Sequence, residues 1–278
     1  MFAEFKHTLR HMRGQLLGWV IGITLYSVLM ASFYDSIAGM EGLVELMKGY
    51  PQEIMAFFGD SVFAITTPDG YLDLYFFGYM AVIIGVLAAA MGNALLVSDE
   101  EKGILDLVLS YPVSRSALFW GRVLGFVSAL ALILFTSWFS WLVTPSSLGL
   151  SWIELLRPFL PLMALLLFFG SLALLLSMLL PSARSAGTLC GGLLIANYLL
   201  IGLSNMNENL KAMIEYTPLY YYQGGDAIFD LNWVWLGGLL GAAIIFTLLA
   251  WWRFQRRDIR VGGEGGWRLP ALSQLLRR

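Results

Sequence analysis

Hydrophobic and charged residues alternate along this chain in long blocks. Six blocks contain no Asp, Glu, Lys or Arg, and they run 15–33, 74–97, 123–144, 158–180, 186–204 and 232–252. A helix rises about 1.5 Å per residue, so roughly 20 apolar residues cross the ~30 Å hydrocarbon core of a bilayer. Each block is between 19 and 24 residues long. The pattern therefore predicts an all-α polytopic membrane protein with six transmembrane helices.

The remaining residues form short connections and two tails, which leaves no room for a second globular domain. We expect a cytoplasmic amphipathic helix over 1–14, a six-helix transmembrane domain over 15–252 and a basic cytoplasmic tail over 253–278. The first apolar block is too long for a signal peptide and five more follow it, so we expect it to be retained.

The N-terminal segment has its own periodicity. Phe2, Phe5, Leu9, Met12 and Leu16 recur at spacings of three and four residues, which places them on one face of a helix. Basic residues lie mostly off that face. Such a helix lies in the membrane interface with its apolar side toward the lipid.

The cytoplasmic loop 98–122 contains a second amphipathic pattern. We expect Ser98 or Asp99 to cap a helix with an acidic first turn, Pro112 to end that helix, and Ser114 to cap the next one. Its apolar face comprises Ile104, Leu105, Val108 and Leu109. Nothing in the same loop covers this face. A cytoplasmic partner is the first explanation, and a helix lying on the bilayer surface is the alternative.

The segment 205–231 near the last block is also organised. Apolar residues at helical spacing are followed by the run Pro218 to Tyr222 and then by Gly224 and Gly225, which break a helix. We expect a re-entrant or interfacial segment. The alternative is an aromatic belt at the headgroup level.

Glycines recur at every fourth position in several blocks, which allows close helix contact in lipid. The longest ridge, Gly14, Gly18 and Gly22, enters the first block. Packing within one chain and an interface between two subunits both explain it.

Charge distribution orients the chain. Hydrophobic residues make up 58% and charged residues 13% of the sequence, as expected for a membrane protein. The two tails and the alternate connections between them carry 14 of the 17 basic residues, so both termini are expected in the cytoplasm. The absence of Asn-x-Ser/Thr sequons is consistent with a prokaryotic plasma membrane. The arginines after Trp252 are expected to anchor a helix end at lipid headgroups, not to bind nucleic acid.

Candidate chemistry is sparse. His7 and His11 have the spacing of a metal-binding pair, but no third ligand of the usual kind lies nearby, so we expect no metal site. The blocks contain none of the acids or histidines of a membrane-embedded hydrolase, and we expect no catalytic residue. The chain has no Gly-x-x-x-x-Gly-Lys-Ser/Thr loop for ATP phosphates.

The residues of the 98–122 loop resemble a stretch of the permease subunits of type-two ABC transporters. The similarity rests on Glu100, Glu101, Gly103, Leu105, Leu109, Pro112, Ser114 and Arg115. The run from Pro218 to Asp226 is similar to a second, weaker pattern of that family, and the N-terminal helix resembles its elbow helix.

This resemblance implies a half-transporter that exports its cargo. Two permease chains, identical or not, would pair, and each would dock the helix around Glu100 to Leu109 on one of two cytoplasmic ATPase subunits, which would hold ATP and Mg. In such proteins the second and fifth helices line the path. Here that implies Asn93, Asn197 and Tyr198.

Two other classes stay open as alternatives. A secondary transporter would carry ionisable residues within its spans, and the six blocks carry none. A structural or signalling membrane protein would have no ATPase partner. The sequence does not identify the cargo.

Overall fold

The computed structural model describes residues 1–40, 42–51, 55, 57, 62–101, 103, 114–180 and 182–256, and these residues form helices without strands. Six helical stretches are long and apolar enough to cross a membrane: Arg13–Ala38, Pro68–Glu100, Arg115–Val143, Trp152–Leu179, Arg184–Met206 and Trp233–Arg256. The predicted fold class, an all-α protein with six membrane-spanning helices, is confirmed.

Most spans correspond to one helix. They are α2 (Arg13–Ala38), α8 (Arg115–Val143), α10 (Phe159–Leu179), α11 (Ala183–Met206) and α13 (Trp233–Arg256). The second span is longer than its charge-free block because three elements join end to end: α5 (Pro68–Leu72), the π-helical turn η2 (Asp73–Phe77) and α6 (Gly78–Glu101). Carboxylates at both ends of this span are therefore helical residues and do not belong to loops.

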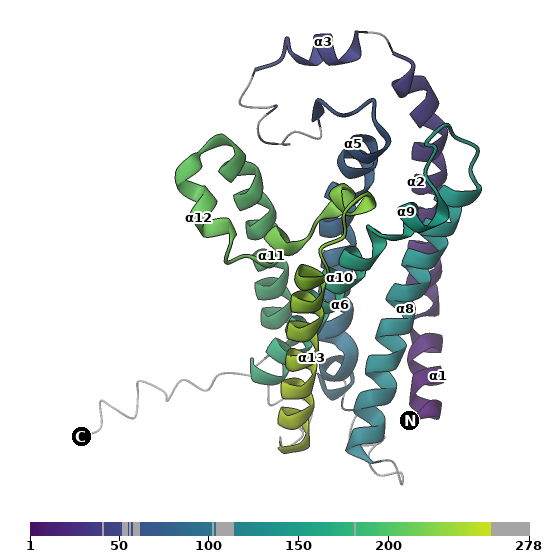
Figure 1. Cartoon of the computed structure of the whole chain (residues 1–278). Helices are drawn as coiled ribbons and strands as arrows, with labels where there is room; N and C mark the ends of the chain where they lie inside the picture. The colour runs from purple at the N-terminus through teal and green to yellow at the C-terminus, as the bar shows by residue number, and fades with distance from the viewer. Residues whose placement is uncertain are drawn as a thin grey trace.

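Helix α10 lies at the centre of the bundle (Figure 1). It packs most extensively on α6 and α13, while α2 packs mainly on α8, and α11 packs on α6 and α10. A Cβ at Gly92 of α6 would overlap the carbonyl of Gly170 in α10, so two glycines allow these backbones to touch. The helices α2, α11 and α13 keep large apolar surfaces uncovered within the chain.

The N-terminal helix α1 (Phe2–His11) is followed by α2 after the single residue Met12, and it packs along the beginning of α8. Only part of the predicted apolar face of α1 packs against the rest of the protein. Leu9 and Met12 pack against the core, whereas Phe2 is exposed and the buried residue is Thr8. Packing against α8, and not the hydrophobic stripe alone, sets the rotation of this helix.

The connections at the other end of the bundle form short helices (Figure 1). Between α2 and α5 lies α3 (Leu43–Met47), and α9 (Trp152–Leu156) precedes α10. The segment before α13 folds into η3 (Glu208–Leu210), α12 (Lys211–Ile214), η4 (Pro218–Tyr221) and η5 (Gly224–Ile228). We call this end the Asp73 end and the opposite one the Asp99 end.

Candidate functional site

The second span ends beyond the point that the sequence predicts. Helix α6 continues to Glu101, so the expectation that Ser98 or Asp99 caps a new helix is wrong. Gly103 then adopts a φ of 67°, a left-handed conformation that glycine accepts without strain, and its N–H donates to the Glu100 carbonyl. Because α6 extends past Asp99, the Asp99 side chain projects from the side of this helix and does not cap a new one.

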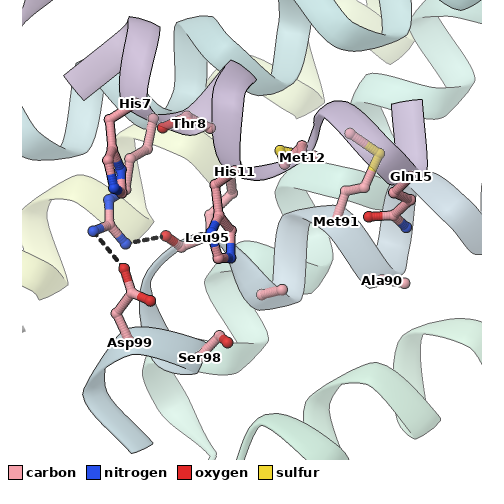
Figure 2. Close-up of a pocket in the computed structure, with 12 residues that line it drawn as sticks. His7, Thr8, His11, Met12, Gln15, Ala90, Met91, Leu95, Ser98 and Asp99 are labelled. Atoms are coloured by element: carbon pink, nitrogen blue, oxygen red, sulfur yellow. Dashed lines mark hydrogen bonds and ion pairs between the residues drawn. The ribbon is translucent and has the colours of Figure 1, made fainter. Parts of the chain in front are cut away.

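A buried arginine holds this last turn of α6. Arg122 of α8 is only 4% exposed, and its Nη1 donates to the Leu95 carbonyl at 2.6 Å. Its Nη2 lies 2.7 Å from Oδ2 of Asp99, and Nε lies 4.0 Å from Oε2 of Glu4. The dashed lines in Figure 2 reach Asp99 and Leu95. One guanidinium thus joins α8 to two successive turns of α6 and faces a carboxylate of α1.

Two glycines bring α1 close enough for this arrangement. A Cβ at Gly121 would lie 2.7 Å from Cβ of Glu4, and one at Gly125 would lie 2.8 Å from Cγ2 of Thr8. Any larger side chain would push α1 away from α8 and remove Glu4 from Arg122. The glycine spacing in the third span therefore serves packing within the chain. We call Glu4, Leu95, Asp99 and Arg122 the Arg122 cluster.

A cavity of about 330 Å³ lies beside the cluster (Figure 2). His7 and His11 of α1 line one side, with their rings stacked 6.2 Å apart, and Ser98 and Asp99 of α6 line the other. The cavity is polar near Asp99 and apolar near Met91.

The chain re-enters the bundle at Ser114, which caps α8 as predicted: its side chain accepts a hydrogen bond from the Ala117 N–H at 3.2 Å. Arg115 donates from Nη1 to the carbonyls of Phe254 and Gln255 at 3.4 and 3.3 Å. These carbonyls belong to the last turn of α13, where cations are favoured by the helix dipole. The start of α8 is thus attached to the end of α13.

The predicted coupling residues are only partly placed. Glu100 is buried within α6, and Gly103, Ser114 and Arg115 flank the segment. Glu101 is described only as the last residue of α6. Five others lie outside the described residues, namely Ile104, Leu105, Val108, Leu109 and Pro112. The structure therefore describes both anchors of the 102–113 segment.

Two of the predicted path residues, Asn93 and Tyr198, lie where α6 faces α11. Asn93 faces α11, because a Cβ at Gly187 would lie 3.0 Å from its Nδ2. Asn197 donates to the Leu193 carbonyl of its own helix at 2.7 Å. Tyr198 lines a cavity of about 150 Å³ together with Asp73 and Tyr79. Tyr198 thus lies at a cavity between these helices.

The segment predicted to be re-entrant or interfacial packs on η2 at the Asp73 end of the second span. Oδ1 of Asp73 accepts a hydrogen bond from the Gly225 N–H at 2.7 Å, and the Tyr222 hydroxyl donates to the Phe77 carbonyl at 3.0 Å. Burial, followed by the nearby Asp73 carboxylate, raises the pKa of the Tyr222 phenol well above its ordinary value. The phenol therefore remains a hydrogen-bond donor at neutral pH.

The glycine ridge of the first span has no neighbour within the described chain. A Cβ at Gly14, Gly18 or Gly22 would meet no atom within 4 Å of the described residues. Helix α2 does not use these glycines for its contact with α8.

Sequence reasoning missed Glu4, Asp73 and Arg122. Asp73 and Arg122 lie outside the charge-free blocks and were therefore placed in connections, and Glu4 was placed in the N-terminal amphipathic helix without a partner. The available signal was the opposite charge of Asp99 and Arg122 next to two consecutive blocks. An antiparallel pair of helices brings such positions to the same end of a bundle.

Comparison with known protein families agrees with this architecture. The family model described as ABC-2 family transporter protein matches residues 3–259, from α1 to just beyond α13. No curated protein gives a significant match. The family is a membrane component of ABC transport and is not itself catalytic. This multi-pass membrane protein belongs to the ABC-2 family of transporter proteins.

Proposed function

We propose that this chain is the permease subunit of an ATP-driven ABC exporter that works as a dimer with separate cytoplasmic ATPase subunits. Membership of the ABC-2 family supports transport and a partnership with an ABC ATPase in general. The Arg122 cluster is the observation that carries the coupling. It fixes the last turn of α6, which precedes the 102–113 segment, to α1 and α8.

Coupling requires that movement of a docked segment reaches the spans. A force on 102–113 acts on Asp99, two residues before the end of α6, and Arg122 passes it to α8. At the other anchor, Arg115 passes it to α13. A segment attached at both ends to long helices is suited to transmit force, whereas a helix resting on the bilayer would need no such attachment.

ATP and Mg belong to two ATPase subunits, and this chain holds neither. Both termini and the 102–113 segment face the cytoplasm, supported by the basic residues at these positions. The plasma membrane of a prokaryote is the proposed location. The contact of α6 with α11 forms part of the path, with Tyr198 at its cavity and Asn93 and Asn197 nearby.

A second permease chain is proposed to pack on α2. The ridge of Gly14, Gly18 and Gly22 is open within the described chain and would allow close contact. Gly18→Leu should leave the thermal stability of the monomer within about 0.5 kcal/mol, as for other unpacked surface positions, yet reduce the dimer fraction. Unchanged dimer content on cross-linking would remove this face as the interface.

The coupling proposal is tested by substitutions in the segment. Leu105→Asp places a charge on the predicted apolar face, and Glu101→Lys reverses a charge at its start. Both variants should insert normally, because neither position lies in a charge-free block, but lose transport and substrate-stimulated ATP hydrolysis. Leu105→Asp should also lose the copurifying ATPase.

The matched control is Leu46→Asp, which introduces the same charge at an exposed leucine of α3 at the opposite end of the bundle. It should retain transport and the ATPase.

Cysteines introduced at Asn209 and Ser114 test the orientation of the chain in the membrane. An impermeant thiol reagent should label only the cysteine at Asn209 in intact cells. Full ATPase binding and transport by Leu105→Asp would favour a helix on the bilayer surface, and a chain that copurifies with no ATPase would favour a secondary transporter or a structural protein.

A further inference from the structure

A small cavity lies between α6 and α11 at the Asp73 end of the second span. Its volume is about 150 Å³, and Tyr198 lines it from α11. The π-helical turn η2 contributes Asp73, and Tyr79 follows at the start of α6. Phe57, from the segment after α2, closes another side, because a Cβ at Gly202 of α11 would overlap its ring. A π-helical turn often marks a functional site. The cavity is thus assembled from three separate parts of the chain.

The polar groups of the cavity are mainly oxygen acceptors. Four side chains bring polar atoms to it, namely Asp73, Tyr79, Tyr198 and Asn205, and the described residues that line it include no Lys, Arg or His. The Asp73 carboxylate accepts a hydrogen bond from the Gly225 N–H at 2.7 Å. An amide N–H is neutral, so this bond does not cancel the charge of the carboxylate. The described lining therefore carries one carboxylate and no cation.

The surroundings of the cavity are acidic as well. The sequence segments between the charge-free blocks at this end are 34–73, 145–157 and 205–231, and they contain 12 Asp and Glu residues but only 3 Lys and Arg residues. An excess of negative charge raises the local concentration of cations and lowers that of anions. An anionic ligand is therefore disfavoured twice, by the charge of this end and by the carboxylate in the cavity.

Two other kinds of occupant fit the lining poorly. A wholly apolar ligand would take Asp73 and the two phenols out of water without offering them a hydrogen bond. A metal ion needs several side-chain ligands, and no group of three or more His, Cys, Asp or Glu that could hold one occurs among the described residues. Aromatic rings beside one carboxylate suit an organic ammonium ion, which is attracted both to ring faces and to negative charge.

We propose that this cavity binds the ammonium group of an organic cation, with Asp73 as the opposite charge and the rings of Tyr79 and Tyr198 beside it. Leu74 and Ile201 offer apolar contact to the alkyl groups of the ligand. The inference rests on the proposed function, in which the contact of α6 with α11 is part of the path, and it adds the class of cargo. Asp73 selects the charge of the cargo, and the two tyrosines select its organic character.

Binding of phenyltrimethylammonium to the chain in nanodiscs tests the site without the ATPase. Equilibrium dialysis of the labelled compound should show saturable binding above that of empty nanodiscs. The neutral compound tert-butylbenzene has the same shape, with carbon in place of the charged nitrogen. It should not compete at the same free concentration, because it gains nothing from the carboxylate.

Asp73→Asn should weaken binding about tenfold or more, because it removes the charge while its amide oxygen still accepts from the Gly225 N–H. The matched control is Asp230→Asn, which removes the same charge from an exposed position at the same end, outside the lining of the cavity. Tyr198→Leu removes a ring and should weaken binding severalfold. Its control is Tyr216→Leu, at a tyrosine that is 89% exposed. Both controls should bind like the parent, and thermal unfolding reports whether each variant is folded.

A lack of saturable binding, or equal binding by folded Asp73→Asn and parent protein, would overturn the cation site. Displacement of the probe by calcium chloride, but not by potassium chloride of the same ionic strength, would show an inorganic-ion site and overturn the organic one.

The place of the site in the path is tested in the complex with the copurified ATPase. Phenyltrimethylammonium should stimulate ATP hydrolysis with the parent chain and much less with Asp73→Asn. Binding without stimulation would overturn the role of the site in recognising cargo. Failure of the site and failure of the proposed function are distinguishable, because the dialysis needs no ATPase.

Discussion

The two ends of the second span are held by the same chemical group in different ways. At one end Oδ2 of Asp99 lies 2.7 Å from a guanidinium nitrogen of Arg122. At the other, Oδ1 of Asp73 lies 2.7 Å from the backbone nitrogen of Gly225. The distances are equal, but one partner is a buried cation on a neighbouring span and the other is a neutral amide of a connecting segment.

This difference separates two kinds of attachment. The Asp99 end joins three helices through the buried cation of Arg122 and two partly exposed carboxylates, and a buried charge is stable only while it keeps a partner. The Asp73 end joins a connection to a helix through a backbone contact, which depends on the absence of a side chain at Gly225. We therefore expect the Asp99 end to resist rearrangement as a unit and the Asp73 end to tolerate small shifts.

The largest effect is expected from Arg122→Met. It leaves the partly exposed carboxylates of Glu4 and Asp99 without their shared cation, and the loss should approach the lower end of the about 3–5 kcal/mol that breaking a fully buried pair costs. Thermal or denaturant unfolding in detergent should show this loss. Arg10→Met, on the exposed side of α1, is the control and should change stability by less than about 0.5 kcal/mol.

The same substitution made in the Asp99→Asn protein measures how much the ion pair contributes to stability. In Asp99→Asn protein one of the two stranded carboxylates is gone, so Arg122→Met should cost less there than in the parent. Equal costs in both backgrounds would show that the ion pair does not stabilise the fold.

An intermediate effect is expected from Gly225→Ala at the Asp73 end. Its Cβ would lie 2.5 Å from Cβ of Asp73 and 2.8 Å from the Asp69 carbonyl oxygen, so the segment must move away from the span. Overpacking of this kind costs about 1–3 kcal/mol. Hydrogen exchange of 222–228 should rise while exchange near Asp99 stays unchanged. Faster exchange at both ends would contradict independent attachment.

The smallest effect is expected from Asp73→Asn. The amide oxygen can still accept from the Gly225 N–H, so only the charge-assisted part of the hydrogen bond is lost, about 1 kcal/mol. Asp99→Asn should cost more, because it removes a charge from beside a buried guanidinium. Stability measurements on the two variants compare the ends directly, and a larger loss from Asp73→Asn would reverse the assignment.

Local signals predicted several features correctly. Ser114 was recognisable as a helix cap from its place before a helical pattern, and the structure places its side chain on the Ala117 N–H. The same reasoning failed at Asp99, where an acidic residue after an apolar block resembles a cap but remains inside the helix. Capping preference is weak when a tertiary partner such as Arg122 stabilises a longer helix.

The glycine patterns show the same limit. Gly121 with Gly125 and the ridge at Gly14, Gly18 and Gly22 have identical spacing. Only the first pair contacts another part of the described chain, namely α1. Spacing predicts that a helix has a face for close approach, but it does not identify what approaches that face.

By itself the sequence determined the six spans and the helical class, because lipid requires each crossing segment to satisfy its backbone internally and to exclude charge. Only the tertiary structure decided that Glu4, Asp99 and Arg122 meet, and that Asp73 bonds Gly225. These residues are far apart in the chain. Their contacts depend on how the helices rotate and how closely they pack, which no local pattern encodes.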